Sequence, residues 1–237
     1  NKQTQPSTDY TQLVNPFIGT DFTGNTYPGA QAPFGMVQLS PDNGLPGWDR
    51  ISGYFYPDST IAGFSHTHLS GTGAGDLYDI SFMPVTLPYQ EAEAPLGIYS
   101  KFSHADEEAS AGYYRVLLKD YDINVELTAT ERCGIQRYTF PEGESAVFLN
   151  LKKAMNWDFT NDSYIVIIDS CTIQGYRFSE GWARDQHVYF RTSFSKPFAS
   201  VEMDTTAIAL KSKRVGTAYI ARFNFDTEKG GQIVLST

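Results

Sequence analysis

The sequence predicts an all-β fold, a large antiparallel β-sandwich, and three observations lead to this fold class. Tyrosine (15) and phenylalanine (16) are abundant, and aromatic residues are enriched in strands. From about Tyr113 onward, short β-prone runs follow one another with turn-forming residues between them. No amphipathic helix of about 10–15 residues separates these runs, which argues against a parallel sheet with crossover helices. The 237 residues are enough for one large domain of this class or for two small ones.

The strand-rich half covers residues 111–237 and shows the clearest pattern. In Val125 to Ala129 the odd positions are apolar and the even positions polar, so one side of that strand should face a core and the other side water. The expected strands share β-branched or aromatic content and end at turn formers. They are Tyr113–Leu118, Asn124–Ala129, Gly134–Phe140, Ser145–Leu151, Tyr164–Ile168, Thr172–Phe178, His187–Phe194, Ala199–Met203, Ala207–Leu210, Thr217–Phe223 and Gln232–Leu235.

The loop-rich half covers residues 13–110, after a flexible N-terminal tether at 1–12. It is dense in Gly, Pro, Ser, Thr and Asn, and we expect only short strands at Met36–Leu39, Gly53–Tyr56 and Asp79–Met83. Long ordered loops on a β scaffold usually display binding groups. A polar region between the halves is interpreted as a solvated linker or surface loop. It contains Glu91, Glu93, Asp106, Glu107 and Glu108.

Charge and composition exclude several partners. The formal net charge of −9 disfavours nucleic acid, and no basic stripe offsets it. No stretch approaches the roughly 18 consecutive apolar residues that a membrane span needs. The residues from Asn1 to Asp9 are polar and lack an export signal, which indicates a mature or trimmed start. Cys133 and Cys171 allow one disulfide or two free thiols, and the sequence does not decide between them.

The segment from Gly63 to Asp76 has the most pointed local pattern, because it holds His66 and His68 two positions apart. With Asp76 or Asp79 brought close by the flexible glycines, these histidines form a conceivable metal site. The spacing alone is a weak signal, and hydrogen bonds within a packed loop or to a polar ligand are the preferred interpretation, so no metal ligand is assigned. Gly71, Gly73 and Gly75 match neither a dinucleotide fingerprint nor a phosphate loop.

Trp48 is a candidate substrate contact. It follows Gly44, Pro46 and Gly47 in a turn-rich stretch that should expose its indole, and an exposed indole suits the apolar face of a sugar ring. The alternative is that the indole caps the core of its own domain. Trp157 and Trp182 lie in the strand-rich half, where we expect both to be packed.

Several runs resemble the N-terminal domain of glycoside hydrolase family 92. The segment from Gly63 to Asp76 resembles the family closely, and the similarity extends in order over nearly the whole chain. The other matching runs are Val14–Thr20, Thr26–Ala30, Pro33–Asp42, Glu180–Ala183 and Phe194–Phe198. Phe55 and Ala74 stand where the family often has His and Cys, which puts the linkage preference in doubt but not the family.

The resemblance implies an N-terminal β-sandwich followed by a larger C-terminal (α/α)6 barrel in a calcium-dependent, inverting exo-α-mannosidase that is secreted, periplasmic or at the cell surface of a bacterium. The barrel is absent from this chain. It would supply the acid, the base and most calcium ligands, so no catalytic residue is assigned here and the isolated fragment should be inactive. Substrates would be α-mannosides of N-glycans or mannans. The residues expected at or near the active-site pocket are Phe17, Gly19, Thr20, His66, His68, Gly71, Gly73 and, beside the leaving-group sugar, Trp48.

Two other functions remain open at the level of sequence. One is a free-standing carbohydrate-binding β-sandwich module that stacks sugar on Trp48 and performs no chemistry. The other is a complete metal-dependent enzyme built on His66 and His68. If a barrel does dock on the sandwich, one face should be unusually apolar, with the segments Asn15–Thr20 and His66–Gly75 at its border.

Overall fold

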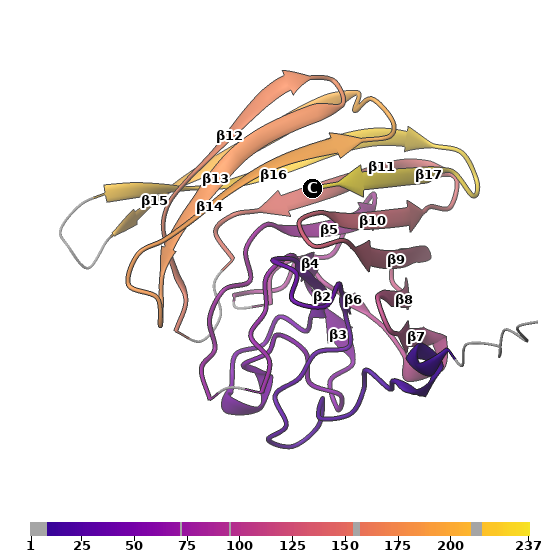
Figure 1. Cartoon of the computed structure of the whole chain (residues 1–237). Coiled ribbons are helices and arrows are strands. Elements are labelled where there is room, and N and C mark those ends of the chain that lie inside the picture. The colour runs from indigo at the N-terminus through magenta and orange to yellow at the C-terminus, as the bar shows by residue number, and fades with distance from the viewer. Residues whose placement is uncertain (1–8, 72, 95, 154–156, 210–214) are drawn as a thin grey trace, which may run out of the picture.

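A computed structural model describes residues 9–237 except 72, 95, 154–156 and 210–214. Two antiparallel sheets face each other and form the sandwich that the sequence predicts (Figure 1). The seven-stranded sheet has the order β1 (Ala30–Gln31), β2 (Gln38–Asp42), β4 (Gly63–Ser65), β5 (Ser81–Thr86), β11 (Gly143–Asn150), β16 (Val215–Thr227) and β15 (Ser200–Ala209). The eight-stranded sheet has the order β12 (Phe159–Asp169), β13 (Thr172–Glu180), β14 (Gln186–Phe194), β17 (Gln232–Ser236), β10 (Gly134–Thr139), β9 (Ile123–Ala129), β8 (Tyr113–Leu118) and β7 (Glu107–Ser110).

The core lies between the sheets and follows the predicted alternation. On β9 the side chains of Ile123, Val125 and Leu127 are buried, whereas the intervening residues are partly or fully exposed. In the opposite sheet, Val147 of β11 pairs in register with Phe223 of β16, and both side chains are fully buried. Full burial of each such side chain stabilises the fold by about 1.5–3 kcal/mol.

The first half of the chain forms the lower part of the molecule, where short strands are joined by long loops (Figure 1). A small two-stranded sheet of β3 (Thr60–Ile61) and β6 (Ser100–Lys101) supports these loops. Among the described residues, three 3-10 helices lie at Tyr10–Leu13, Trp48–Arg50 and His104–Asp106. In the described part of the chain no helix is long and apolar enough to cross a membrane. The proposed tether includes residues 1–8, which lie outside the described residues.

Two strand predictions differ from the structure. Gly53–Tyr56 was expected as a strand but is irregular, because Gly53 has φ +88° and the Asn43 side chain accepts the Phe55 N–H at 2.5 Å. The runs expected at Ala199–Met203 and Ala207–Leu210 belong to one strand, β15, because its pairing with β16 continues without a break. Leu210 itself lies outside the described residues.

The polar region between the halves is only in part the solvated loop that we expected. Glu107 begins β7, and its carboxylate is almost fully buried. Tyr54 donates to it at 3.0 Å and Tyr114 at 2.6 Å, while His104 Nδ1 lies 2.6 Å away. The prediction of an exposed residue was wrong here because these partners replace the water that a carboxylate otherwise needs. The cluster ties the loop-rich half to the main sheet.

Candidate functional site

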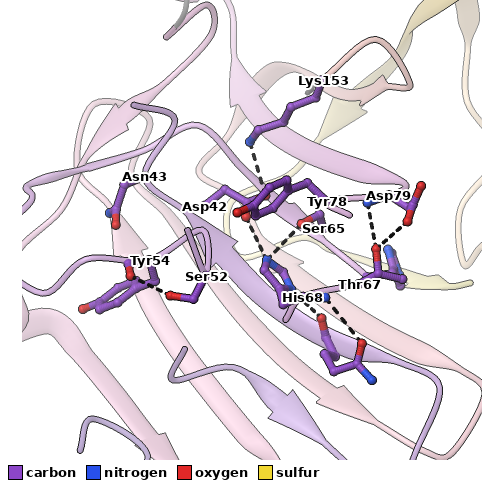
Figure 2. A network of polar contacts seen from close by, with 12 residues as sticks. Asp42, Asn43, Ser52, Tyr54, Ser65, Thr67, His68, Tyr78, Asp79 and Lys153 are labelled. Atoms are coloured by element: carbon purple, nitrogen blue, oxygen red, sulfur yellow. Dashed lines mark hydrogen bonds and ion pairs between the residues drawn. The ribbon is translucent and has the colours of Figure 1, made fainter. Parts of the chain in front are cut away.

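His68 lies in a buried polar network beneath the loops (Figure 2). Its Nδ1 is 2.7 Å from the carbonyl oxygen of Gln38, and its Nε2 is 2.8 Å from Asp42 Oδ1. Both neighbours are acceptors, so the ring can donate to both only when it carries two protons. Burial alone would raise the pKa of Asp42, but Lys153 and His68 outweigh burial and hold that pKa below its usual range. The network therefore fixes the position of His68 from inside the domain.

His66 is also buried, but its environment is different. Its Nδ1 lies 2.7 Å from the carbonyl oxygen of Ile80, whereas its Nε2 has no hydrogen-bond partner among the described residues. Burial lowers the pKa of His66 to about 4. The ring is therefore neutral near pH 7, with Nδ1–H donating to the carbonyl.

The carboxylates considered for a metal site have other partners. Asp79 Oδ1 accepts from Arg177 at 2.6 Å, and Asp76 Oδ2 accepts from the Trp182 N–H at 2.8 Å. Within the described residues, no group of three or more His, Cys, Asp and Glu side chains is arranged to hold a metal ion. The two-histidine metal hypothesis therefore has no donor set in this part of the chain.

Arg177 on β13 organises the region below the segment 71–76, which we call the glycine loop and whose residue 72 is outside the described residues. The guanidinium is fully buried, and it contacts Asp79, Asp158 and the carbonyl oxygen of Lys153. Burial raises the pKa of Asp158 to about 7, although Arg177 acts in the opposite direction. This ion cluster connects Asp79, which follows the glycine loop, with the segment that precedes β12.

Trp48 is 57% exposed, which confirms the expectation of an indole at the surface. It begins a short 3-10 helix whose Arg50 Nε donates to Asp58 Oδ2 at 2.6 Å, so the helix is tied to the next loop. The indole lies against the glycine loop, since a Cβ placed on Gly73 would be 3.4 Å from the Trp48 ring. The structure thus brings together two of the predicted site residues, Trp48 and Gly73.

Trp157 and Trp182 correct the expectation of packed indoles, because they are 56% and 65% exposed. The Trp157 N–H donates to the carbonyl oxygen of Gly75 at 3.1 Å, and the Trp182 N–H donates to Asp76. Both tryptophans are therefore attached by their backbone to the glycine loop, while their indoles remain at the surface. We call Trp48, Trp157 and Trp182 the loop tryptophans.

The remaining predicted residues lie at different depths. Gly71 and Gly73 are exposed, Phe17 is half-buried, and Thr20 is buried with its hydroxyl donating to the Phe17 carbonyl oxygen. Gly19 has φ +84°, and its carbonyl oxygen accepts the Thr26 N–H at 3.2 Å, which closes the turn from Gly19 to Thr26. The carbonyl oxygen of Asn25 accepts the Gly71 N–H at 2.6 Å, which joins this turn to the glycine loop.

Exposed apolar side chains occur at both segments that we expected to border a docking face. Ile18 within the first segment and Phe22 just after it are 73% and 80% exposed. Trp48 lies beside Gly73 of the second segment, and Trp157 donates its backbone N–H to Gly75.

Sequence reasoning missed Arg177, Trp157 and Trp182 as parts of this region. The signal for Trp182 was Gly181, where an added Cβ would lie 2.1 Å from Asp76 Oδ1, so glycine lets the carboxylate approach the backbone. Arg177 stands in an alternating strand and gives no local sign that its long side chain turns inward.

Both cysteines, Cys133 and Cys171, are free thiols in the structure, so the disulfide that the sequence allowed is not formed.

Comparisons with known proteins agree on one family. The model of the glycosyl hydrolase family 92 N-terminal domain matches residues 13–237. A family 92 α-mannosidase from Bacteroides thetaiotaomicron has a TM-score of 0.87 and 36% identity, and the alignment covers 98% of this chain and 33% of that chain. The same enzyme was also solved in complex with mannoimidazole. A family 92 inverting mannosidase from Bacteroides thetaiotaomicron has a TM-score of 0.77 and 25% identity, covering 98% of this chain and 32% of its own.

An uncharacterized secreted glycosidase from Arthroderma benhamiae is 29% identical over 143 residues, which are 58% of this chain and 18% of that protein. The chain thus spans about a third of the solved enzymes that it resembles. Their names describe an α-mannosidase and an inverting mannosidase, and the family model that matches this chain describes an N-terminal domain. This chain belongs to glycoside hydrolase family 92, as its N-terminal domain.

Proposed function

We propose that this chain is the N-terminal domain of a secreted, calcium-dependent, inverting exo-α-mannosidase that acts on α-mannosides of N-glycans or mannans. The domain forms one wall of the active site and presents Trp48 to the leaving-group sugar. The single observation that carries the sugar contact is the half-exposed indole of Trp48 against the glycine loop. Family membership supports the reaction class.

The division of labour in this proposal follows from the side chains that the domain offers. Inversion needs an acid and a base carboxylate roughly 6.5–9.5 Å apart with room for water between them. Asp42, Asp79 and Asp158 are instead buried and paired with cations. Among the described residues no three His, Cys, Asp or Glu side chains are grouped to hold a metal ion, so we assign the acid, the base and calcium to the remainder of the enzyme, and this chain alone should not hydrolyse an aryl α-mannoside.

Trp48→Ala in the full-length enzyme tests the sugar contact. Loss of an aromatic contact should reduce kcat/KM for α-mannobiosides by about 5- to 30-fold, judged from about 1–2 kcal/mol for aromatic contacts and interfaces in general. The kcat/KM for an activated aryl mannoside should fall less, because its leaving group is an aryl group and not a sugar that Trp48 would contact. Equal losses on both substrates would indicate a general structural role, and no loss on either would show that Trp48 only packs.

A second candidate is a carbohydrate-binding module that acts without chemistry, and the exposed indoles of Trp48 and Trp157 favour it. A glycan array with the isolated chain separates the two functions. Tight binding of mannose-containing glycans by this chain, together with unchanged mannosidase activity in a Trp48→Ala enzyme, would support the module and contradict the active-site wall.

A further inference from the structure

Trp48 and Trp157 form a pair that the sequence does not suggest, since 108 residues separate them along the chain. Their ring centroids are 6.4 Å apart with an interplanar angle of 60°, which is contact distance for two aromatic rings. Each indole nevertheless remains more than half exposed. Two large adjoining apolar surfaces left in water usually mark a place where a ligand or partner binds.

Contacts made by Trp157 and by the next residue fix the backbone that carries the exposed Trp157 side chain. Its N–H donates to Gly75 of the glycine loop, and the next residue, Asp158, pairs with the fully buried Arg177. Arg177 also pairs with Asp79, three residues after the glycine loop. Trp157 is therefore fixed to the loop that contacts Trp48, so both rings keep their relation to one another.

We propose that Trp157 is a second substrate-contacting residue, which together with Trp48 forms an aromatic corner around the leaving-group sugar and determines the linkage preference. The proposal rests on the proposed function. A sugar cannot be sandwiched between the rings, because that would need about 7–8 Å, two van der Waals contacts of roughly 3.5–4 Å each. At 60°, one indole covers a C–H face of the pyranose and the other contacts its edge.

The corner explains how an aromatic surface can select a linkage. A single indole allows a pyranose to rotate about the normal to the ring plane, because stacking alone does not discriminate between hydroxyl positions. A second ring at the edge removes that rotation and therefore fixes which hydroxyl points toward the scissile bond. Trp157 should thus affect the ratio of activities on different linkages and leave the released mannosyl group untouched.

The experiment compares kcat/KM of the full-length enzyme and its variants on the four α-mannobioses (1,2, 1,3, 1,4 and 1,6) and on α-mannosyl fluoride, which has no leaving-group sugar. Trp157→Ala should lower kcat/KM on the preferred mannobiose by about 3- to 10-fold and narrow its lead over the other linkages, with less than about twofold change on the fluoride. Trp48→Ala and Trp157→Ala should combine to less than the product of their separate losses, because contacts to one sugar are coupled.

Trp182→Ala is the matched control, since this indole is exposed and attached to the same loop but has no ring contact with Trp48 among the described residues. Its linkage ratios should equal those of the wild type. Trp157→Phe keeps an aromatic edge and gives a smaller loss in the same direction, which covers the case in which Trp157→Ala does not fold.

Three results would overturn the inference. They are equal losses on mannobiose and fluoride, unchanged kinetics in Trp157→Ala, or the same ratio change in Trp182→Ala. A wild-type enzyme that cleaves no α-mannoside would refute the proposed function instead. An active enzyme with a selective effect of Trp48→Ala but none of Trp157→Ala would refute only the role of Trp157.

Discussion

Arg177→Met should destabilise the domain strongly, and the loss should depend on pH. Methionine fills much of the volume of the arginine stem but leaves two buried carboxylates, Asp79 and Asp158, without their cation. All three side chains are fully buried in the folded protein. Removal of one partner from a buried ion pair costs about 3–5 kcal/mol, which is a large part of the stability of a typical domain.

The pH dependence follows from Asp158. Its folded pKa of about 7 is above the ordinary aspartate value of 3.8, so the folded state binds more protons and wild-type stability falls as pH rises toward 7. Without Arg177 this pKa rises further, and the decline then continues to higher pH. Between pH 6 and pH 8 the variant should therefore lose about 1–2 kcal/mol more than the wild type. A simple loss of packing would give the same difference at both pH values.

The assay is urea unfolding at pH 6 and pH 8, followed by circular dichroism and tryptophan fluorescence. Arg137→Met is the matched control, because Arg137 makes a two-bond contact with Glu126 at the surface, at 2.6 Å for each bond. That variant should lose less than about 1 kcal/mol at either pH. If Arg177→Met lowers the free energy of unfolding by less than about 1 kcal/mol, or by an amount that does not change with pH, the argument that Arg177 stabilises the two buried carboxylates is refuted.

Two further predictions concern residues near the glycine loop. Because burial lowers the pKa of His66 to about 4, the unfolded state binds more protons between pH 4 and 6.5, and stability should fall by up to about 3 kcal/mol as pH drops through this window. His66→Gln should flatten the dependence in acid unfolding curves, and an unchanged slope would show that another group titrates. Gly181→Ala should cost about 1–3 kcal/mol and change tryptophan fluorescence, because the new Cβ would meet Asp76 and displace the Trp182 backbone. A wild-type spectrum and urea midpoint in that variant would contradict the close approach.

The strand-rich half was predictable because its signal is local. Alternation along Ile123–Ala129 places every second side chain in the core, and turn formers bound the neighbouring runs. The strand predicted at Gly53–Tyr56 was wrong for a reason that no local pattern contains. Asn43 accepts the Phe55 N–H, which a neighbouring strand would otherwise accept. The prediction of an exposed Glu107 was wrong for the same reason, because the hydroxyls that donate to its buried carboxylate come from Tyr54 and Tyr114, elsewhere in the sequence.

The candidate site was predictable only at Trp48 and the exposed glycines. Turn-forming neighbours predict an exposed indole, and the Trp48 side chain is exposed in the structure. Trp157 lies just before β12 and Trp182 just after β13, where side chains are ordinarily packed. The exposure of both depends on contacts to a loop about 80–110 residues away in sequence. Long-range contacts of this kind set the site but leave no periodicity in the chain.

The buried ion cluster has a consequence for how such a site keeps its shape. An exposed indole has few packing contacts of its own, so its position depends on the backbone that carries it. Polar contacts hold that backbone at Gly75 and Asp76, and Arg177 connects the residues after the loop with the segment that carries Trp157, through Asp79 and Asp158. Apolar residues of similar volume often give equal or greater stability than buried ion pairs, but they lack directed hydrogen bonds. The cluster therefore contributes a defined position for the loop and its tryptophans, and an apolar replacement that preserved stability should still alter the separation of the two rings.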